Sequence, residues 1–248
     1  MGHLLPFWRY YGAKWKAAPH YPAPRFDTLV EPFAGAAGYA LRHYRKRVIL
    51  VERYEVVASI WAFLIRSPSR DILSIPTVDA VADLPDSTPQ EARWLVGMCM
   101  NAAAVSPNRV MSSGMRKLRD EHGRSTEGWG DGQRARVARQ VDLIRHWTVI
   151  HGDYTEAPDV EATWFVDPPY EDKGRHYVHN SAALDFTALG EWCRARRGQT
   201  IVCEAVGATW LPFRAFRNVR ASPMSRRSGV VAEAIWTSGE TQPTLEGV

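Results

Sequence analysis

Short apolar runs bounded by turn residues occur toward both ends of the chain, and helical spacing follows several of them. Six such runs predict strands, at residues 26–33, 47–52, 147–150, 162–166, 199–204 and 232–237. Three segments with helical spacing predict helices, at residues 39–45, 56–65 and 186–197. A strand, a small-residue turn, a helix and a second strand in this order predict a doubly wound α/β domain.

The middle of the chain lacks this alternation. Residues 93–103 and 134–146 have helical periods, whereas residues 106–132 are rich in Ser, Gly and Arg and predict a loop. We therefore expect a largely helical subdomain, inserted into a single α/β domain. The expected boundaries are 67–146 for the inserted subdomain, and 1–66 together with 147–248 for the α/β domain.

Composition narrows the class of protein without identifying it. Hydrophobic residues make up 45% of the chain and charged residues 23%, as in ordinary globular proteins. The three cysteines (99, 193 and 203) are odd in number and lack CxxC spacing, so we expect neither a zinc site nor a disulfide framework. No signal-peptide pattern or apolar run of roughly 20 residues is present, so we expect a cytoplasmic protein without a membrane partner.

The strongest chemical signal is Asp167-Pro168-Pro169-Tyr170, which directly follows the apolar run 162–166. Open α/β sheets bind ligands at the carboxyl ends of their strands. Two successive prolines fix their own φ angles and restrict the residues before them to extended geometry. An acid, a rigid turn and an aromatic ring are thereby held in fixed relation. The alternative is a tight turn that ends a strand, with the tyrosine in ordinary packing.

These residue types suit methylation of an aromatic amine. The Asp167 carboxylate and the Pro168 carbonyl can each accept an N–H hydrogen bond, which favours a pyramidal, nucleophilic nitrogen. The Tyr170 ring offers a flat surface for a base. A sulfonium methyl group is already activated, so in-line positioning supplies much of the remaining catalysis without a metal. We therefore interpret residues 167–170, hereafter the DPPY loop, as the catalytic loop.

Five segments resemble, in order, the motifs of the Dam-type DNA adenine N6-methyltransferases of bacteria and phages. They are Tyr10–Lys14, Glu31–Gly38, Val51–Glu52, Gly152–Tyr154 and the DPPY loop. The resemblance implies a Rossmann-like S-adenosylmethionine-dependent methyltransferase fold whose inserted subdomain recognises the target sequence. It also implies methyl transfer from S-adenosyl-L-methionine to adenine N6 in double-stranded DNA, in a bacterial or phage-infected cell.

The resemblance assigns cofactor-binding roles to the N-terminal motifs. Tyr10 and Lys14 match the first cofactor motif, in which the lysine meets the methionine carboxylate of the cofactor. Glu31, Phe33 and Gly35 match the first strand and its turn, where small residues let the backbone approach the cofactor. A solvated surface lysine is the alternative interpretation of Lys14.

Three later positions complete the implied cofactor site. Glu52 is expected to accept hydrogen bonds from the ribose hydroxyls, as acids at the end of the second strand do in nucleotide sites. Asp153 and Tyr154 match the pair that holds the adenine of the cofactor, and Asp167 is expected to border the cofactor as well. The alternatives are an exposed strand-end acid at Glu52 and a plain loop at residues 153–154.

Three alanines depart from the family pattern. Ala13, Ala36 and Ala37 stand where the family usually has glycine. If one of these positions needs a positive φ, the added methyl group crowds the cofactor and lowers its affinity.

Basic residues dominate the region expected to meet DNA. Between residues 106 and 148 there are nine Lys or Arg and five Asp or Glu, and the net charge of the chain is +4. Positive charge helps to offset the cost of flipping a base out of the duplex, which is roughly a few kcal/mol. The candidate DNA-binding residues are Asn108, Arg109, Arg116, Lys117, Arg119 and Arg124. A second basic set, for which a solvated face is the alternative, is Arg214, Arg217, Arg220, Arg226 and Arg227.

Other functions fit parts of the sequence. Related enzymes that methylate cytosine N4, guanine or glutamine usually begin the catalytic loop with Ser or Asn, so Asp167 favours adenine. An RNA adenine methyltransferase and a non-catalytic nucleic-acid-binding relative stay open as alternatives. A Rossmann oxidoreductase would need a GxGxxG turn, which the chain lacks. We expect a monomer, with a dimer as the alternative; neither the recognition sequence nor a partner restriction enzyme follows from the residues.

Overall fold

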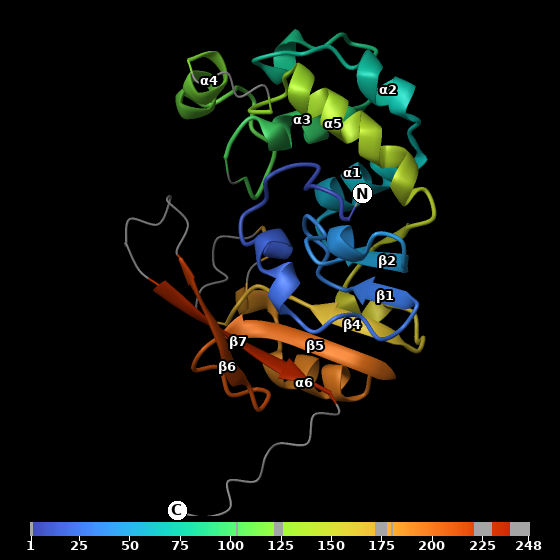
Figure 1. The fold of residues 1–248 in the computed structure, drawn as a ribbon, viewed down its shortest axis with the longest axis vertical. Coiled ribbons are helices and arrows are strands. Elements are labelled where there is room, and N and C mark those ends of the chain that lie inside the picture. Colours follow the sequence, from blue (N-terminus) through green and yellow to red (C-terminus); the bar gives the residue numbers. More distant parts are fainter. Residues whose placement is uncertain are drawn as a thin grey trace, which may run out of the picture.

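A seven-stranded sheet forms the centre of the computed structural model, which describes residues 2–102, 104–121, 126–171, 178–179, 181–220 and 230–238. The strand order is β3-β2-β1-β4-β5-β7-β6 (Figure 1). The strands are β1 (Thr28–Glu31), β2 (Arg47–Glu52), β3 (Thr148–His151), β4 (Ala162–Val166), β5 (Gly198–Ala205), β6 (Arg214–Arg220) and β7 (Val230–Thr237). The first five are parallel, whereas β7 is antiparallel to both of its neighbours, β5 and β6.

Both faces of the sheet are covered, which explains why its central strands are apolar throughout. On β4, Phe165 joins the larger hydrophobic cluster together with helix α1 (Glu55–Arg66). Its neighbours Trp164 and Val166 point to the other face and join the smaller cluster with α6 (Phe186–Arg194). Burying a side chain such as Phe165 contributes roughly 1.5–3 kcal/mol, so the two clusters fix the register of the strand.

The segment between β2 and β3 is mostly helical. After α1 it contains α2 (Ser69–Ser74), α3 (Gln90–Cys99), α4 (Ser113–Asp120) and α5 (Asp131–Val141). These four helices gather at one end of the molecule, beyond β1 and β2 (Figure 1), and α2 packs against α5. The boundaries of an inserted subdomain at residues 67–146 stay a prediction.

The prediction of a loop over residues 106–132 was wrong where α4 forms. The Ser112 hydroxyl caps this helix by accepting the Met115 N–H at 3.4 Å. Met115 is the one buried side chain of α4, so the helix has no apolar stripe that a periodicity could reveal. Helix α5 likewise begins at Asp131, before the predicted position 134.

Two other predictions need correction. The predicted helix at residues 39–45 is a short 3-10 turn, η3. The basic strip after residue 205 contains an unpredicted edge strand, β6; basic side chains on an edge strand deter pairing with other chains. The 3-10 segments are η1 (Lys14–Lys16), η2 (Ala18–His20), η3 (Ala40–His43), η4 (Val81–Asp83), η5 (Asp142–Ile144), η6 (Tyr154–Glu156) and η8 (Ser181–Ala183).

The three cysteines are buried and unbonded, as expected from their spacing. Within the described ranges, every helix is too short or too polar to cross a lipid bilayer. The predicted frayed tail, residues 239–248, lies outside the described residues.

Candidate active site

The carboxyl ends of β1, β2 and β4, with the turn after β3, surround one pocket. β1 and β4 are neighbours from which the chain proceeds outward in opposite directions, so the pocket lies at the topological switch point of the sheet. The empty space between its walls is about 890 Å³ when the solvent at its open mouth is counted.

All nine residues predicted to bind the cofactor line this pocket. They are Tyr10, Lys14, Glu31, Phe33, Gly35, Glu52, Asp153, Tyr154 and Asp167. Within the DPPY loop, Asp167 and Pro169 line the pocket, whereas Pro168 and Tyr170 are not part of its wall. Residues from five separated segments of the chain are therefore brought to one place, although their individual roles stay predictions.

The turn after β1 is shaped by a glycine that has a positive φ. Gly35 has φ +45°, and its N–H donates to Glu52 Oε2 at 2.8 Å. A Cβ added at Gly35 would lie 3.3 Å from the Tyr10 ring, so the aromatic ring rests directly on the backbone of the turn. This close approach explains why a glycine is required here.

The three unusual alanines behave differently from one another. Ala13 has φ −53° and lines the pocket with Ala36. Ala37 has φ +49°, the one positive value outside glycine in the described part of the chain. Its side chain is fully buried in the larger hydrophobic cluster and is not part of the pocket wall. The positive φ that the alanines were expected to strain therefore occurs at Ala37 in the hydrophobic core, and not at an alanine that lines the pocket.

Glu52 is already hydrogen-bonded by the protein. Its two carboxylate oxygens accept the N–H groups of Gly35 and Tyr54, each at 2.8 Å. Burial raises the pKa of Glu52, and these backbone N–H groups oppose that rise. Each oxygen has a second lone pair, so Glu52 can bridge the β1 turn and a bound hydroxyl at the same time.

An aromatic pair borders the pocket beside Asp153. The Phe33 and Tyr154 rings stack with centroids 5.5 Å apart and planes 25° apart. Asp153 caps η6 by accepting the Thr155 N–H at 3.3 Å, and it lies 3.7 Å from Arg53. Asp153 is therefore a cap with a partly exposed carboxylate, and the flat surface is supplied by the two rings.

Asp167 and Lys14 form an ion pair at the centre of the site. Lys14 Nζ lies 2.8 Å from Asp167 Oδ1 and 2.9 Å from Oδ2, and 4.8 Å from the centroid of the Tyr170 ring. Burial raises the pKa of Asp167, and Lys14 lowers it. In this structure the predicted partner of the cofactor carboxylate thus binds the predicted catalytic acid.

Glu31 is a second acid buried at the end of β1. It is 3% exposed and accepts the Ala40 N–H. Burial raises the pKa of Glu31 to about 8, against the lowering effect of this N–H. The carboxyl group of Glu31 is therefore mostly protonated at neutral pH.

Two features of the site were missed by sequence analysis. A Cβ on Gly38 would lie 2.5 Å from the Trp15 backbone nitrogen, so this glycine is where the N-terminal segment crosses the β1 turn. Glu233 on β7 accepts the Tyr170 hydroxyl at 2.9 Å and lies 3.7 Å from Lys14 Nζ. No motif contains Glu233, because it reaches the site only through strand pairing.

The predicted DNA-binding residues lie on and before α4, apart from the pocket. Arg119 makes a bidentate bond to Asp79, at 2.5 and 3.2 Å, and Arg116 lies 3.5 Å from the same carboxylate. Lys117 pairs with Glu121 at 3.7 Å. Arg119 is therefore an anchor for α4, whereas Arg116 and Lys117 stay about half exposed or more.

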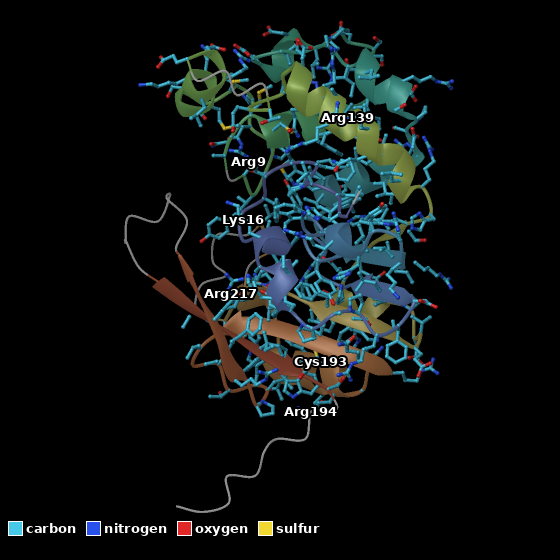
Figure 2. The ribbon with its side chains drawn as sticks, viewed as in Figure 1. Arg9, Lys16, Arg139, Cys193, Arg194 and Arg217 are labelled. Carbon is cyan, nitrogen blue, oxygen red and sulfur yellow. The ribbon has the colours of Figure 1, made fainter. Side chains whose placement is uncertain are left out.

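The remaining candidates for DNA contact are exposed, half-buried or outside the described residues. Asn108 donates to the Ser106 carbonyl at 3.3 Å, and Arg109 is exposed beside it. Arg214 and Arg217 lie on β6; Figure 2 labels Arg217. Arg124, Arg226 and Arg227, and the side chain of Arg220, lie outside the described residues.

Comparisons with known proteins do not name a family for this chain, so its fold class rests on the strand order. No protein-family profile matches the chain, and no curated protein is similar to it in sequence. A solved structure described as a conserved hypothetical protein of Streptococcus pyogenes is similar at 11% identity and a TM-score of 0.35, over 91% of this chain and 93% of that one. The strand order 3-2-1-4-5-7-6 with an antiparallel β7 is typical of the class I methyltransferase fold, and the predicted fold class is confirmed.

Proposed function

We propose that this chain is a site-specific DNA methyltransferase that transfers a methyl group from S-adenosyl-L-methionine to N6 of adenine in double-stranded DNA. The observation that carries the proposal is the DPPY loop, which follows β4 and presents Asp167 to the pocket. An aspartate in this position of a methyltransferase-like fold favours an amine acceptor.

The pocket residues fit S-adenosyl-L-methionine. Glu52 has lone pairs for the ribose hydroxyls, Phe33 and Tyr154 offer an aromatic surface for the adenine, and the small residues at 34–38 leave room for the methionine part. When bound, the cofactor supplies an activated methyl group. Lys14 is the nearby cation for a carboxylate and would exchange its bond to Asp167 for one to the cofactor.

The residues of the DPPY loop would then position the amine. Asp167 and the Pro168 carbonyl would accept its two N–H groups, which favours a pyramidal nitrogen with an available lone pair. The rigid Pro168-Pro169 backbone keeps these acceptors in place, and the Tyr170 ring supports the base. Because only the carboxylate form of Asp167 accepts an N–H in this way, activity falls as the pH drops through the raised pKa of Asp167.

Two projecting elements of the molecule carry our candidate contacts to double-stranded DNA. Helix α4 and the β6–β7 hairpin extend from the body of the molecule on the same side (Figure 1). Arg116 and Lys117 on α4 are exposed, and so is Arg214, the first residue of β6. Arg9, labelled in Figure 2, lies near α4, 3.9 Å from Met115 and 2.6 Å from Glu127. Cations at these positions can hold the phosphates on either side of a flipped base.

The test is methyl transfer to DNA by the purified protein. We expect N6-methyladenine in unmethylated DNA incubated with the protein and S-adenosyl-L-methionine. Asp167→Ala is expected to lower the rate by about a hundredfold or more, as removal of a preorganised group does elsewhere. The exposed Asp86→Ala is the matched control and should keep full activity. Sequencing of DNA from a methylase-free host would identify the target sequence.

Three outcomes contradict the proposal. Full activity of Asp167→Ala would show that the DPPY loop is not catalytic. Transfer of labelled methyl groups to RNA but not to DNA would favour an RNA adenine methyltransferase instead. Calorimetry that detects no binding of S-adenosyl-L-methionine would favour a non-catalytic nucleic-acid-binding protein.

A further inference from the structure

We propose that Glu233 is a positioning residue of this site, which fixes the Tyr170 ring through its hydroxyl group and shares the Lys14 ammonium with Asp167. The inference rests on the proposed function and extends it to a strand that carries no recognised motif. Tyr170 and Glu233 are 63 positions apart in the chain.

The contact depends on the antiparallel strand β7. Pairing with β5 brings Glu233 beside the DPPY loop, where its side chain is 6% exposed and accepts the Tyr170 hydroxyl at 2.9 Å. The next residue, Glu171, donates its N–H to Glu204 on β5 at 3.3 Å. Two neighbouring strands therefore hold the end of the loop, β5 through the Glu171 N–H and β7 through the Tyr170 hydroxyl. Tyr170 also lowers the pKa of Asp167 through a side-chain hydrogen bond.

The Glu233 carboxylate binds Tyr170 in the site and not Arg217 on the neighbouring strand. Arg217 is opposite Glu233 in the β6–β7 register, a position that favours an ion pair between the two side chains. No ion pair between them is present, and both Arg217 Nη1 and Glu233 Oε2 are buried without a hydrogen-bond partner among the described residues. A glutamate that served only to hold the hairpin together would bind Arg217; this one binds Tyr170 and approaches Lys14.

One ammonium group thus serves two carboxylates, the buried Glu233 and the partly buried Asp167. Lys14 Nζ is 2.8 Å from Asp167 and 3.7 Å from Glu233. The negative charge of Glu233 raises the pKa of Asp167 and Lys14 lowers it. Glu233 also gives Lys14 a second anionic partner, beside Asp167 and in addition to the Gly12 carbonyl at 3.3 Å, so that Asp167 can release the ammonium when an amine arrives. The titratable groups around Asp167 are Lys14, Tyr21, Glu31, Tyr170, Cys203, Glu204 and Glu233.

Three variants separate the hydrogen bond from the charge. Tyr170→Phe keeps the ring and removes the hydroxyl, Glu233→Leu removes both acceptor and charge, and Glu233→Gln keeps an acceptor without the charge. We expect Tyr170→Phe and Glu233→Leu each to lower kcat about ten- to a hundredfold, the factor for a hydrogen bond to a charged group. The double variant should be no slower than either single one, and Glu233→Gln should restore most of the rate.

Two readouts distinguish positioning from simple stability. The fluorescence of 2-aminopurine, placed at the target adenine, should rise less with Tyr170→Phe and Glu233→Leu than with the wild type. The affinity for S-adenosyl-L-methionine should stay within about twofold. Tyr39→Phe is the matched control, because it removes another buried hydroxyl bond, to the Pro22 carbonyl at 2.6 Å, and should leave kcat unchanged.

The pH profile tests the shared charge. Without the negative charge of Glu233, the pKa of Asp167 falls, so the acidic limb of kcat/KM should move to lower pH in Glu233→Gln. A limb that stays in place or moves upward overturns the shared role of Lys14.

The proposal and the proposed function fail in different ways. If the wild type makes no N6-methyladenine, the function is wrong. If the wild type is active and Glu233→Leu keeps its kcat, or if the effects of Glu233→Leu and Tyr170→Phe multiply, the positioning role is wrong. Urea unfolding of the same double-mutant cycle needs no substrate, and an absence of coupling there overturns the contact itself.

Discussion

At the scale of single residues, the site is notable for acids that are buried rather than solvated. Asp167 and Glu31 follow or end neighbouring strands, and burial raises the pKa of both. Charged carboxylates are costly to bury, so proteins keep them where chemistry or a bound ligand compensates. The position of these acids after apolar runs identifies them in the sequence. Their raised pKa values depend on burial, which the sequence does not show.

Glu31→Gln is expected to flatten the dependence of stability on pH. The folded-state pKa of Glu31, about 8, lies above its ordinary value of 4.5. The stability that this group contributes is therefore complete below about pH 4.5 and is lost as the pH rises toward about 8. Urea unfolding across this range should show a smaller decline for Glu31→Gln than for the wild type. Glu191→Gln, an exposed control, should follow the wild type; equal slopes for Glu31→Gln and wild type contradict the prediction.

At the scale of elements, the site depends on how the N-terminal segment crosses the β1 turn. Gly38 allows the backbone of Lys14 and Trp15 to lie against it. The Arg42 guanidinium then stacks on the Trp15 ring at 3.9 Å, and the Trp15 indole N–H donates to the Leu4 carbonyl at 2.7 Å. Sequence analysis identified the Tyr10–Lys14 motif, yet the crossing itself follows only from backbone proximity.

Gly38→Ala is expected to displace this segment. The new Cβ would meet backbone atoms 2.5 and 3.0 Å away, which flexible side-chain motion cannot relieve. We expect lower stability and an affinity for S-adenosyl-L-methionine reduced about tenfold or more, one order of magnitude being about 1.4 kcal/mol. Gly114→Ala on α4 is the matched control, because nothing lies within 4 Å of its Cβ. Calorimetry measures the stability and the affinity for S-adenosyl-L-methionine. Wild-type affinity in Gly38→Ala would show that cofactor binding does not need the N-terminal segment to cross the β1 turn in this way.

At the scale of the whole molecule, the proposed function requires a surface that binds DNA. Helix α4 is anchored by Arg119 and Asp79 and leaves Arg116 and Lys117 largely exposed. Exposed ion pairs such as Lys117–Glu121 contribute little to stability, so these cations can exchange partners for phosphates at low cost.

The double variant Arg116→Gln/Lys117→Gln is expected to weaken DNA binding and its dependence on salt. Each lost phosphate contact lowers the slope of log K against log salt by about 0.9. Fluorescence anisotropy of labelled duplex DNA at several salt concentrations measures this slope. Arg194→Gln, on α6 at the far end of the molecule from α4 (Figures 1 and 2), is the control and should leave it unchanged. A double variant with the wild-type slope would place DNA elsewhere.

The sequence by itself determined the elements whose chemistry is local. Apolar runs predicted β1 to β5 and β7. For β1, β2 and β4 the reason is that buried parallel strands need apolar side chains on both faces. The DPPY loop and the acids at strand ends could be read directly, since each stands beside the strand that positions it. The helix α4 could not, because one buried methionine gives no period.

Only the tertiary structure decided which distant residues meet. Glu233 reaches Tyr170 through antiparallel pairing of β7, Gly38 admits the N-terminal segment, and Lys14 binds Asp167. Strand order and backbone crossings are set by the packing of the whole sheet, so no local pattern encodes these contacts. The sequence therefore predicted nine residues that line the pocket, and the fold determined how they are paired and that Glu233 joins them.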